Sequence, residues 1–198
     1  MDYPELNVPF PGKEIFLRLG GHLTKTQVDP AAACRFQRYA LEAFRLCRPR
    51  GRWQIFPVTA VTDEAIILAD GSSIPGGDFS RKNRDISFLW CGAVTVGKAV
   101  TETRDSLEMV SARAVYDAVA GECADGAMDM LQALAAGELL RRNLRLDKRR
   151  FSPGYGDMPL EVQKFFFSSL QLEKLDMVLN DKFFMIPEKS VTALAGVR

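Results

Sequence analysis

Histidine is nearly missing from this sequence, since His22 is the only one among 198 residues. A zinc site built on histidine therefore has no support, and neither has a nucleophile that depends on a histidine base. The glycine-rich fingerprints of P-loop and dinucleotide-binding proteins are also missing. These absences exclude the hydrolase, kinase and dehydrogenase classes that short motifs identify.

Cysteine pairs, long apolar runs and a leader pattern are lacking as well. The four cysteines are scattered and form no CxxC pair, which is typical of buried thiols in a reducing compartment. No apolar run approaches the roughly 20 residues that a membrane span needs. Residues 1–13 hold two acids and three prolines rather than the basic start and apolar core of a signal peptide. We therefore expect a cytoplasmic protein with no membrane partner.

An excess of charge of one sign is the last absence. The sequence has 26 Lys and Arg against 25 Asp and Glu, a net charge of +1, which gives no reason to expect a nucleic-acid partner. A chain of this size buries roughly 70% of its unfolded surface, so it needs no metal or disulfide to fold. There is no repeat, low-complexity tract or clear linker, and we expect one domain over residues 1–198.

Helices are predicted where apolar residues recur every three or four positions. Asp29 followed by Pro30 is typical of an N-cap and a first helical residue. Gly121 and Gly126 weaken a long helical stretch, so either a break or close helix packing is expected there. The predicted helices cover residues 29–48, most of 98–136, 139–146 and 159–170.

Strands are predicted where β-branched and aromatic residues cluster. Residues 85–96 (DISFLWCGAVTV) are too apolar to lie on a surface, and Pro57 places its own strand at an edge or a bend. The predicted strands are 14–19, 53–61, 65–68, 85–96 and the end of the tail 183–197, with loops at 70–73 and 75–77. Because paired helical stretches separate these strands, the pattern predicts an α+β domain rather than a doubly wound sheet.

The segment Arg150–Asp157 (RFSPGYGD) contains the residues most suited to a ligand. The residue before Pro153 is biased toward an extended backbone. Gly154 and Gly156 permit backbone angles, and a close approach to a ligand, that other residues resist. A tight turn without a ligand is the alternative interpretation of the same composition.

Two side chains of this segment have the chemistry for one kind of small molecule. Arg150 offers a fixed fork of N–H donors that suits a carboxylate. Tyr155 offers a flat ring and a hydroxyl group. A ligand with one carboxylate and one aromatic ring fits both, and an amino-acid-bearing nucleoside is such a ligand.

The same residues resemble a known family. Arg150, Gly154 and Tyr155 match the R-x-x-x-G-Y signature with which the activation domain of cobalamin-dependent methionine synthase binds S-adenosylmethionine. The stretch RFSPGYGDMPLEVQ, the helix after it and residues 185–196 (MIPEKSVTALAG) are similar to the C-terminal region of the shorter, stand-alone members of that family. The resemblance covers about half the chain, from Ile86 onward.

The resemblance implies a fold, a ligand and a site. The fold is a twisted, mainly antiparallel sheet flanked by long helices. Arg150 would pair with the methionine carboxylate, the backbone around Ser152 and Gly154 would contact the ligand, and Tyr155 would pack against it or hydrogen-bond to it. Asp125 falls where the family has a ligand-contacting glutamate, and Asp129, one helical turn on, is the other candidate. No catalytic residue and no metal ligand are assigned.

The resemblance also implies a partner. In that family the activation domain presents S-adenosylmethionine to inert cob(II)alamin, which one electron and a methyl group convert to methylcobalamin. The cobalamin would be carried by a separate methionine synthase polypeptide, and a flavodoxin-like protein would supply the electron. Three alternatives remain open: an autonomous methyltransferase acting on a small molecule, a reactivation partner of another corrinoid methyltransferase, and a scaffold that has lost the ligand.

Overall fold

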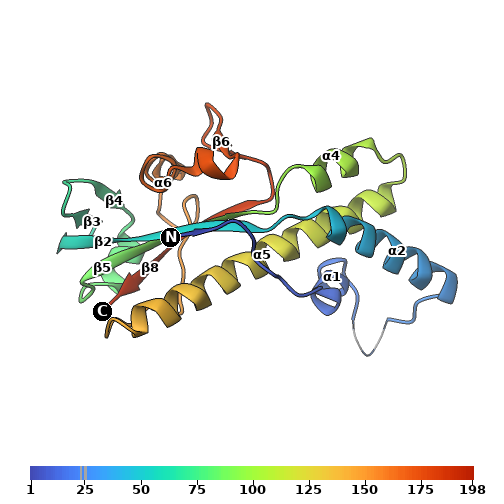
Figure 1. Cartoon of the computed structure of the whole chain (residues 1–198), viewed down its shortest axis with the longest axis horizontal. Coiled ribbons are helices and arrows are strands. Elements are labelled where there is room, and N and C mark those ends of the chain that lie inside the picture. The colour runs from blue at the N-terminus through green and yellow to red at the C-terminus, as the bar shows by residue number, and fades with distance from the viewer. Residues whose placement is uncertain (23, 25) are drawn as a thin grey trace.

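A computed structural model describes residues 1–22, 24 and 26–198. Its centre is an antiparallel sheet in the order β4-β3-β2-β5-β8, with β1 beside the start of β2 (Figure 1). The strands of this sheet are β1 (Asp2–Tyr3), β2 (Arg50–Val61), β3 (Ala65–Leu68), β4 (Ser73–Pro75), β5 (Phe88–Thr95) and β8 (Ser190–Val197). The antiparallel sheet and the long helices beside it confirm the α+β fold.

The strand β2 pairs with two different strands along its length. Its first half pairs with β5 as far as Pro57 opposite Phe88, and its second half pairs with β3 from Val58 onward. The register shifts between Val58 and Ala60, which marks a bulge. Proline cannot donate to a ladder, so the change of partner at Pro57 agrees with the predicted bend.

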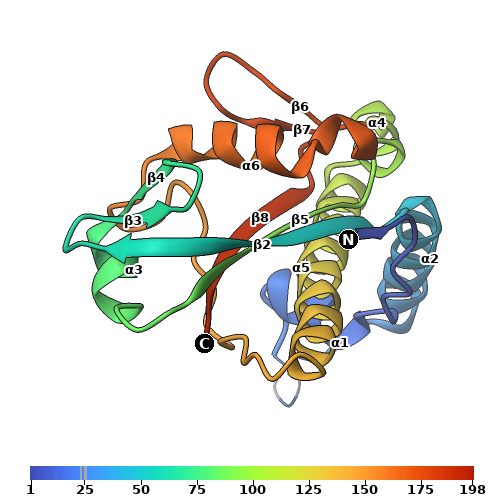
Figure 2. The same ribbon diagram turned by 60° about the vertical axis from the view of Figure 1, so that its left-hand side comes forward.

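One face of the sheet is covered by one long helix, and three shorter helices pack against that helix rather than along the sheet (Figure 2). The helix α5 packs on the sheet through buried residues such as Leu131, which meets Trp53 and Trp90. An ideal Cβ on Gly51 would lie 3.1 Å from the Leu131 Cδ1 atom, so glycine allows this close approach. The helices on this side of the molecule are α1 (Gly12–Arg18), α2 (Pro30–Leu46), α4 (Ala99–Ser106) and α5 (Val110–Leu140).

The opposite face is covered by the C-terminal third of the chain. Leu89 and Cys91 of β5 point to this face and pack with Phe166 of α6, whereas Trp90 and Val94 point to α5. The strand β5 is therefore buried on both faces, which explains its unbroken apolar sequence. The elements near this face are α3 (Gly77–Lys82), η1 (Leu160–Val162), α6 (Gln163–Leu170), η2 (Leu172–Leu175), β6 (Val178–Leu179) and β7 (Met185–Ile186).

The prediction of a strand at residues 14–19 is wrong, because these residues belong to the helix α1. Ile15 is fully buried, while Leu17 and Leu19 are exposed. A short apolar run is compatible with a helix or with a strand. Ile15 packs in the core cluster that also holds Ala40 and Val119, and this packing favours the helix.

The helical stretch predicted over most of residues 98–136 is confirmed, with a break at residues 107–109. The helix stays continuous at Gly121 and Gly126, where close packing against Arg18 and Val8 is found instead of a break. One predicted helix is wrong in its extent. The helix predicted over 139–146 ends at Leu140, because Asn143 adopts a left-handed backbone with φ of 58°. The residues after it lie beside β8 instead.

The loops predicted at 70–73 and 75–77 are only partly right, since β4 pairs with β3 over Ser73–Pro75 and α3 begins at Gly77. The other predicted helices and strands are confirmed to within a few residues. Within the described ranges, no helix is long and apolar enough to cross a membrane. No group of three or more His, Cys, Asp or Glu residues there is arranged to hold a metal ion.

Candidate functional site

The predicted ligand segment lies along the free edge of β8. The backbone N–H of Phe151 donates to the carbonyl of Leu194 at 2.9 Å, and Leu194 donates back at 2.7 Å. Arg145 and Arg198 exchange a second pair of hydrogen bonds. The chain between α5 and η1 therefore follows β8 as an irregular edge strand and brings the segment 150–157 beside the sheet.

Arg150 is held by two side chains from α5. Its Nη2 atom lies 2.7 Å from Asp129 Oδ1, and its Nη1 atom donates to Gln132 Oε1 at 2.7 Å. The amide of Gln132 donates in turn to the carbonyl of Asp147 at 2.7 Å. Because the Gln132 side chain is mostly buried and tied to the loop backbone, it fixes the orientation of the guanidinium.

The acid beside Arg150 is therefore Asp129. Asp125 instead accepts from Arg18 of α1 at 2.7 Å, and Glu122 accepts from the same guanidinium. The Glu122 hydrogen bond is the main reason that the pKa of Arg18 is raised. The structure brings together Arg150 and Asp129, and it does not place Asp125 in contact with Arg150.

The loop beyond Arg150 has the backbone that its glycines suggest. Gly154 and Gly156 have φ values of 87° and 61°, a region that other residues adopt at a cost. The Gly154 N–H donates to the carbonyl of Met158 at 3.0 Å, and Tyr155 donates to Ser152 at 3.2 Å. This turn leaves the Tyr155 side chain 76% exposed, so its ring is free to meet a ligand or a partner.

The base of the loop is fixed by aromatic and acidic contacts. The ring of Phe151 lies 4.8 Å from that of Phe79, and the cations of Lys82 and Arg149 lie over it at 5.4 and 5.2 Å. Asp157 accepts from the Asp78 N–H in the first turn of α3. The half-buried Arg150 and the exposed Tyr155 thus lie on an ordered support.

The end of β8 adds an ion-pair cluster to the same edge. Arg198 donates to both carboxylate oxygens of Asp85 at 2.7 and 2.8 Å, and it also pairs with Asp147. The hydrogen bond from Arg198 lowers the pKa of the Asp85 carboxyl. The cluster joins the end of the sheet to the residues that lead to Arg150.

The sequence did not single out Gln132, and it did not predict the contact of Asp157 with α3. Gln132 follows Asp129 by three positions, a spacing that puts two helical residues on one face, so the signal was present. The role of Asp157 depends on α3, which is far from it in sequence, and no local pattern could have revealed the contact.

No family model matches this sequence, and no curated protein matches it either. Among solved structures, 13 chains match. One is the crystal structure of the MetH reactivation domain bound to AdoHcy, with a TM-score of 0.64 and 18% identity over 98% of this chain and 79% of that chain. The fold of this chain is thus the fold of the MetH reactivation domain, as the resemblance in its sequence predicted.

Proposed function

We propose that this chain binds S-adenosylmethionine and supports the reductive remethylation of cob(II)alamin on a separate cobalamin-dependent methionine synthase. The observation that carries the proposal is the Arg150 fork, held by Asp129 and Gln132 beside an exposed Tyr155. The likeness in fold to a reactivation domain bound to AdoHcy supports it. A cytoplasmic location and a flavodoxin-like electron donor belong to the same proposal.

The donor set at the β8 edge fits an amino-acid-bearing nucleoside. Arg150 has five N–H donors, and its contacts with Asp129 and Gln132 leave others for a ligand carboxylate. Asp129 is an acceptor for the ammonium group of the same ligand, and the backbone of Ser152 and Gly154 offers further polar contacts. Tyr155 supplies a ring face for the adenine or a hydroxyl group for the ribose.

The residues of this chain act by binding and orientation. S-adenosylmethionine supplies an electrophilic methyl group on its sulfonium sulfur. Arg150 and Asp129 would fix the amino-acid end of S-adenosylmethionine. The loop 152–156 would position the rest of the ligand at the sheet edge. Holding one reactant in a defined geometry lowers the entropic cost of bringing the two reactants together. Cobalt chemistry would belong to the partner.

An autonomous methyltransferase is the second candidate from the sequence. Such an enzyme needs an acceptor pocket and usually a general base. His22, the only histidine of the sequence, forms hydrogen bonds with Thr24 and Thr26, which follow α1. Arg150 instead is held by residues of α5 beside β8. We assign no general base at the β8 edge, and we therefore favour the reactivation role.

Two measurements test the proposal. Calorimetry should show that the purified chain binds S-adenosylmethionine and S-adenosylhomocysteine. Mixed with its cobalamin protein, S-adenosylmethionine and a one-electron reductant, it should convert cob(II)alamin to methylcobalamin, which the absorption spectrum reports. Without the cobalamin protein there should be no methyl transfer to homocysteine. Steady turnover of S-adenosylmethionine by the isolated chain would instead establish the autonomous methyltransferase.

A further inference from the structure

Gln132 is a nearly buried glutamine of α5 whose side-chain amide is used on both sides. Its Nε2 atom donates to the carbonyl of Asp147 at 2.7 Å and to that of Lys148 at 3.3 Å. Its Oε1 atom accepts from Arg150 at 2.7 Å. A reversed amide would place its N–H groups against the Arg150 donor and its oxygen against two carbonyls. The contacts therefore define one orientation of the amide, which presents an acceptor to Arg150.

The backbone that holds this amide is itself ordered. The Asp147 N–H donates to the carbonyl of Gly196 in β8 at 2.9 Å. The Asp147 carboxylate also pairs with Arg198 at the end of the same strand. Gln132 thus joins the guanidinium of Arg150 to backbone groups that the edge of the sheet keeps in place.

Asp129 and Gln132 hold Arg150 in different ways. The Asp129 side chain is 71% exposed, so water and salt screen its ion pair with Arg150. The same carboxylate is the acceptor proposed above for the ligand ammonium group. Gln132 is nearly buried and neutral, so it keeps its contact when a ligand binds and leaves the positive charge of Arg150 uncompensated. It orients the guanidinium without reducing the attraction of Arg150 for a carboxylate.

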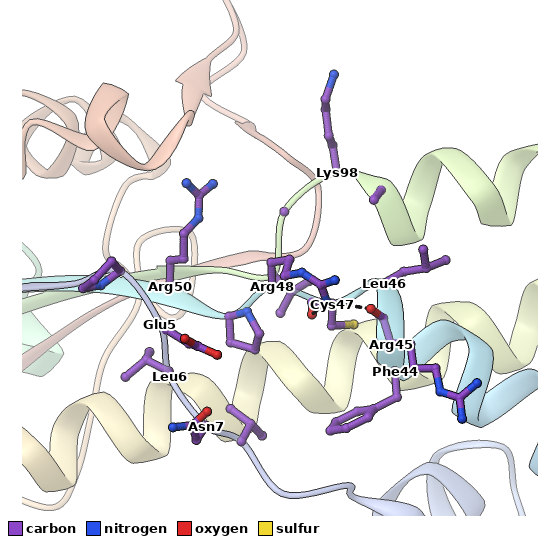
Figure 3. A pocket seen from close by; sticks show the side chains of 16 residues that line it. Glu5, Leu6, Asn7, Phe44, Arg45, Leu46, Cys47, Arg48, Arg50 and Lys98 are labelled. Atoms are coloured by element: carbon purple, nitrogen blue, oxygen red, sulfur yellow. Dashed lines mark hydrogen bonds between the residues drawn. The ribbon is translucent and has the colours of Figure 1, made fainter.

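The cations at the start of β2 lack an arrangement of this kind. They border a cavity of about 920 Å³ between the segment after β1, the end of α2 and the turn between β5 and α4 (Figure 3). Arg50 and Lys98 extend to one side in this view, and Arg45 extends to the opposite side. The Nη1 atom of Arg48 donates to the carbonyls of Arg45 and Cys47, and no carboxylate within the described residues pairs with Arg48. Because these cations diverge, they offer no common point to an anion.

We propose that Gln132 is a positioning residue for the ligand carboxylate at the β8 edge, and that it makes this site select nucleosides that carry an amino-acid chain. The inference rests on the function proposed above. Arg150 has five N–H donors, and its contacts with Asp129 and Gln132 hold the remaining donors in a defined direction. Binding a carboxylate then costs less side-chain entropy than it would with a mobile arginine. A nucleoside without the amino-acid chain gains nothing from this arrangement.

The test compares two ligands on one variant. S-adenosylhomocysteine carries the amino-acid chain, and methylthioadenosine has the same adenine, ribose and sulfur without it. Gln132→Met removes the amide and keeps a side chain of similar volume. Calorimetry should show about fivefold weaker binding of S-adenosylhomocysteine and unchanged binding of methylthioadenosine. Equal weakening of both ligands, or no weakening of either, would overturn the proposal.

Two further comparisons separate positioning from a general effect on the fold. Gln163→Met is the matched control, because Gln163 is also buried but accepts from Thr192 at 2.9 Å instead of from Arg150. This control should leave the affinity for S-adenosylhomocysteine unchanged. In an Arg150→Ala background, Gln132→Met should cause no further loss of affinity, since Gln132 acts through Arg150. A full additional loss there would show that Gln132 acts on the fold, and would contradict the proposal.

The wild-type chain separates this proposal from the function on which it rests. If the wild-type chain binds neither ligand, the proposed function is wrong and Gln132 has no carboxylate to position. If the wild-type chain binds S-adenosylhomocysteine and Gln132→Met binds it equally tightly, the role of Gln132 alone is wrong.

Discussion

The β8 edge and the start of β2 hold their arginines in opposite ways. Arg150 at the β8 edge is already paired with Asp129 and Gln132, whereas Arg48 near β2 has no carboxylate partner within the described chain. A ligand at the first place must fit around existing partners, which favours selectivity. At the second place the guanidinium keeps free charge, which attracts anions without selecting among them, and added salt weakens that attraction.

The two places differ most in how tightly the backbone is packed. An ideal Cβ on Gly196 of β8 would lie 2.5 Å from Asn83 Oδ1 and 2.9 Å from Asp147 Oδ2. The same atom on Gly51 of β2 would lie 3.0 Å from the Val94 Cγ1 atom. Gly196→Ala should therefore cost about 3 kcal/mol of stability and Gly51→Ala about 1 kcal/mol, measured by urea unfolding. Equal losses would contradict this difference in packing.

Removal of the Arg150 guanidinium should affect the ligand more than the fold. Arg150→Ala should cost about 1.5–3 kcal/mol of S-adenosylmethionine binding, because it removes a charge-assisted pair. Calorimetry measures the effect. Arg149→Ala is the matched control, since its guanidinium lies over Phe151 and the net charge changes equally. If Arg150→Ala binds as tightly as the control, Arg150 is not the carboxylate anchor.

The two acids of α5 should differ in their effect on the ligand. Asp129 pairs with Arg150 and Asp125 with Arg18, so Asp129→Asn should weaken S-adenosylmethionine binding by about 1 kcal/mol while Asp125→Asn has little effect. Both variants lose one carboxylate from the same helix, so each controls for the other. A larger loss for Asp125→Asn would restore the assignment made from the sequence.

The smallest effect is expected from an ion pair that ties the start of β8 to α4. A hydrogen bond from Arg104 lowers the pKa of Glu188 from 4.5 to about 2. A lowered pKa stabilises the fold above pH 4.5, and that contribution is lost as the pH falls toward about 2. Because the Glu188 side chain is largely exposed, Glu188→Gln should remove less than about 1 kcal/mol of this acid dependence. Thermal unfolding across this pH range measures it, and an unchanged slope would exclude the pair as its source.

The parts of the fold that the sequence predicted are those with long and regular patterns. The cap at Asp29 with Pro30 is formed, since Asp29 accepts from the Ala32 N–H at 3.0 Å. The apolar run in β5 and the bend at Pro57 also follow from local composition. The helix α1 could not be predicted because Ile15 is a single anchor in a short segment, and its partners come from distant helices.

The candidate site was predictable in part. The residue types of segment 150–157 and the left-handed turn at its glycines follow from the sequence. The choice between Asp125 and Asp129 could not be made, because one helical turn separates them and Arg18 occupies Asp125 from the other end of the chain. The cavity at the start of β2 is lined by Glu5, Arg48 and Lys98. These residues are far apart in the sequence, so no local pattern connects them.

The burial of β5 on both faces has a consequence for the exchange of amide hydrogens with solvent. Its amides lie between β2 and β8, under α5 on one face and near Phe166 on the other. Such amides open only when the sheet as a whole comes apart, so their protection reports the global free energy of unfolding. The ribbon of β3 and β4 pairs with β2 only beyond Pro57, so we expect its amides to exchange through smaller local openings. We therefore expect the amides of β5 to show the slowest hydrogen exchange in the molecule.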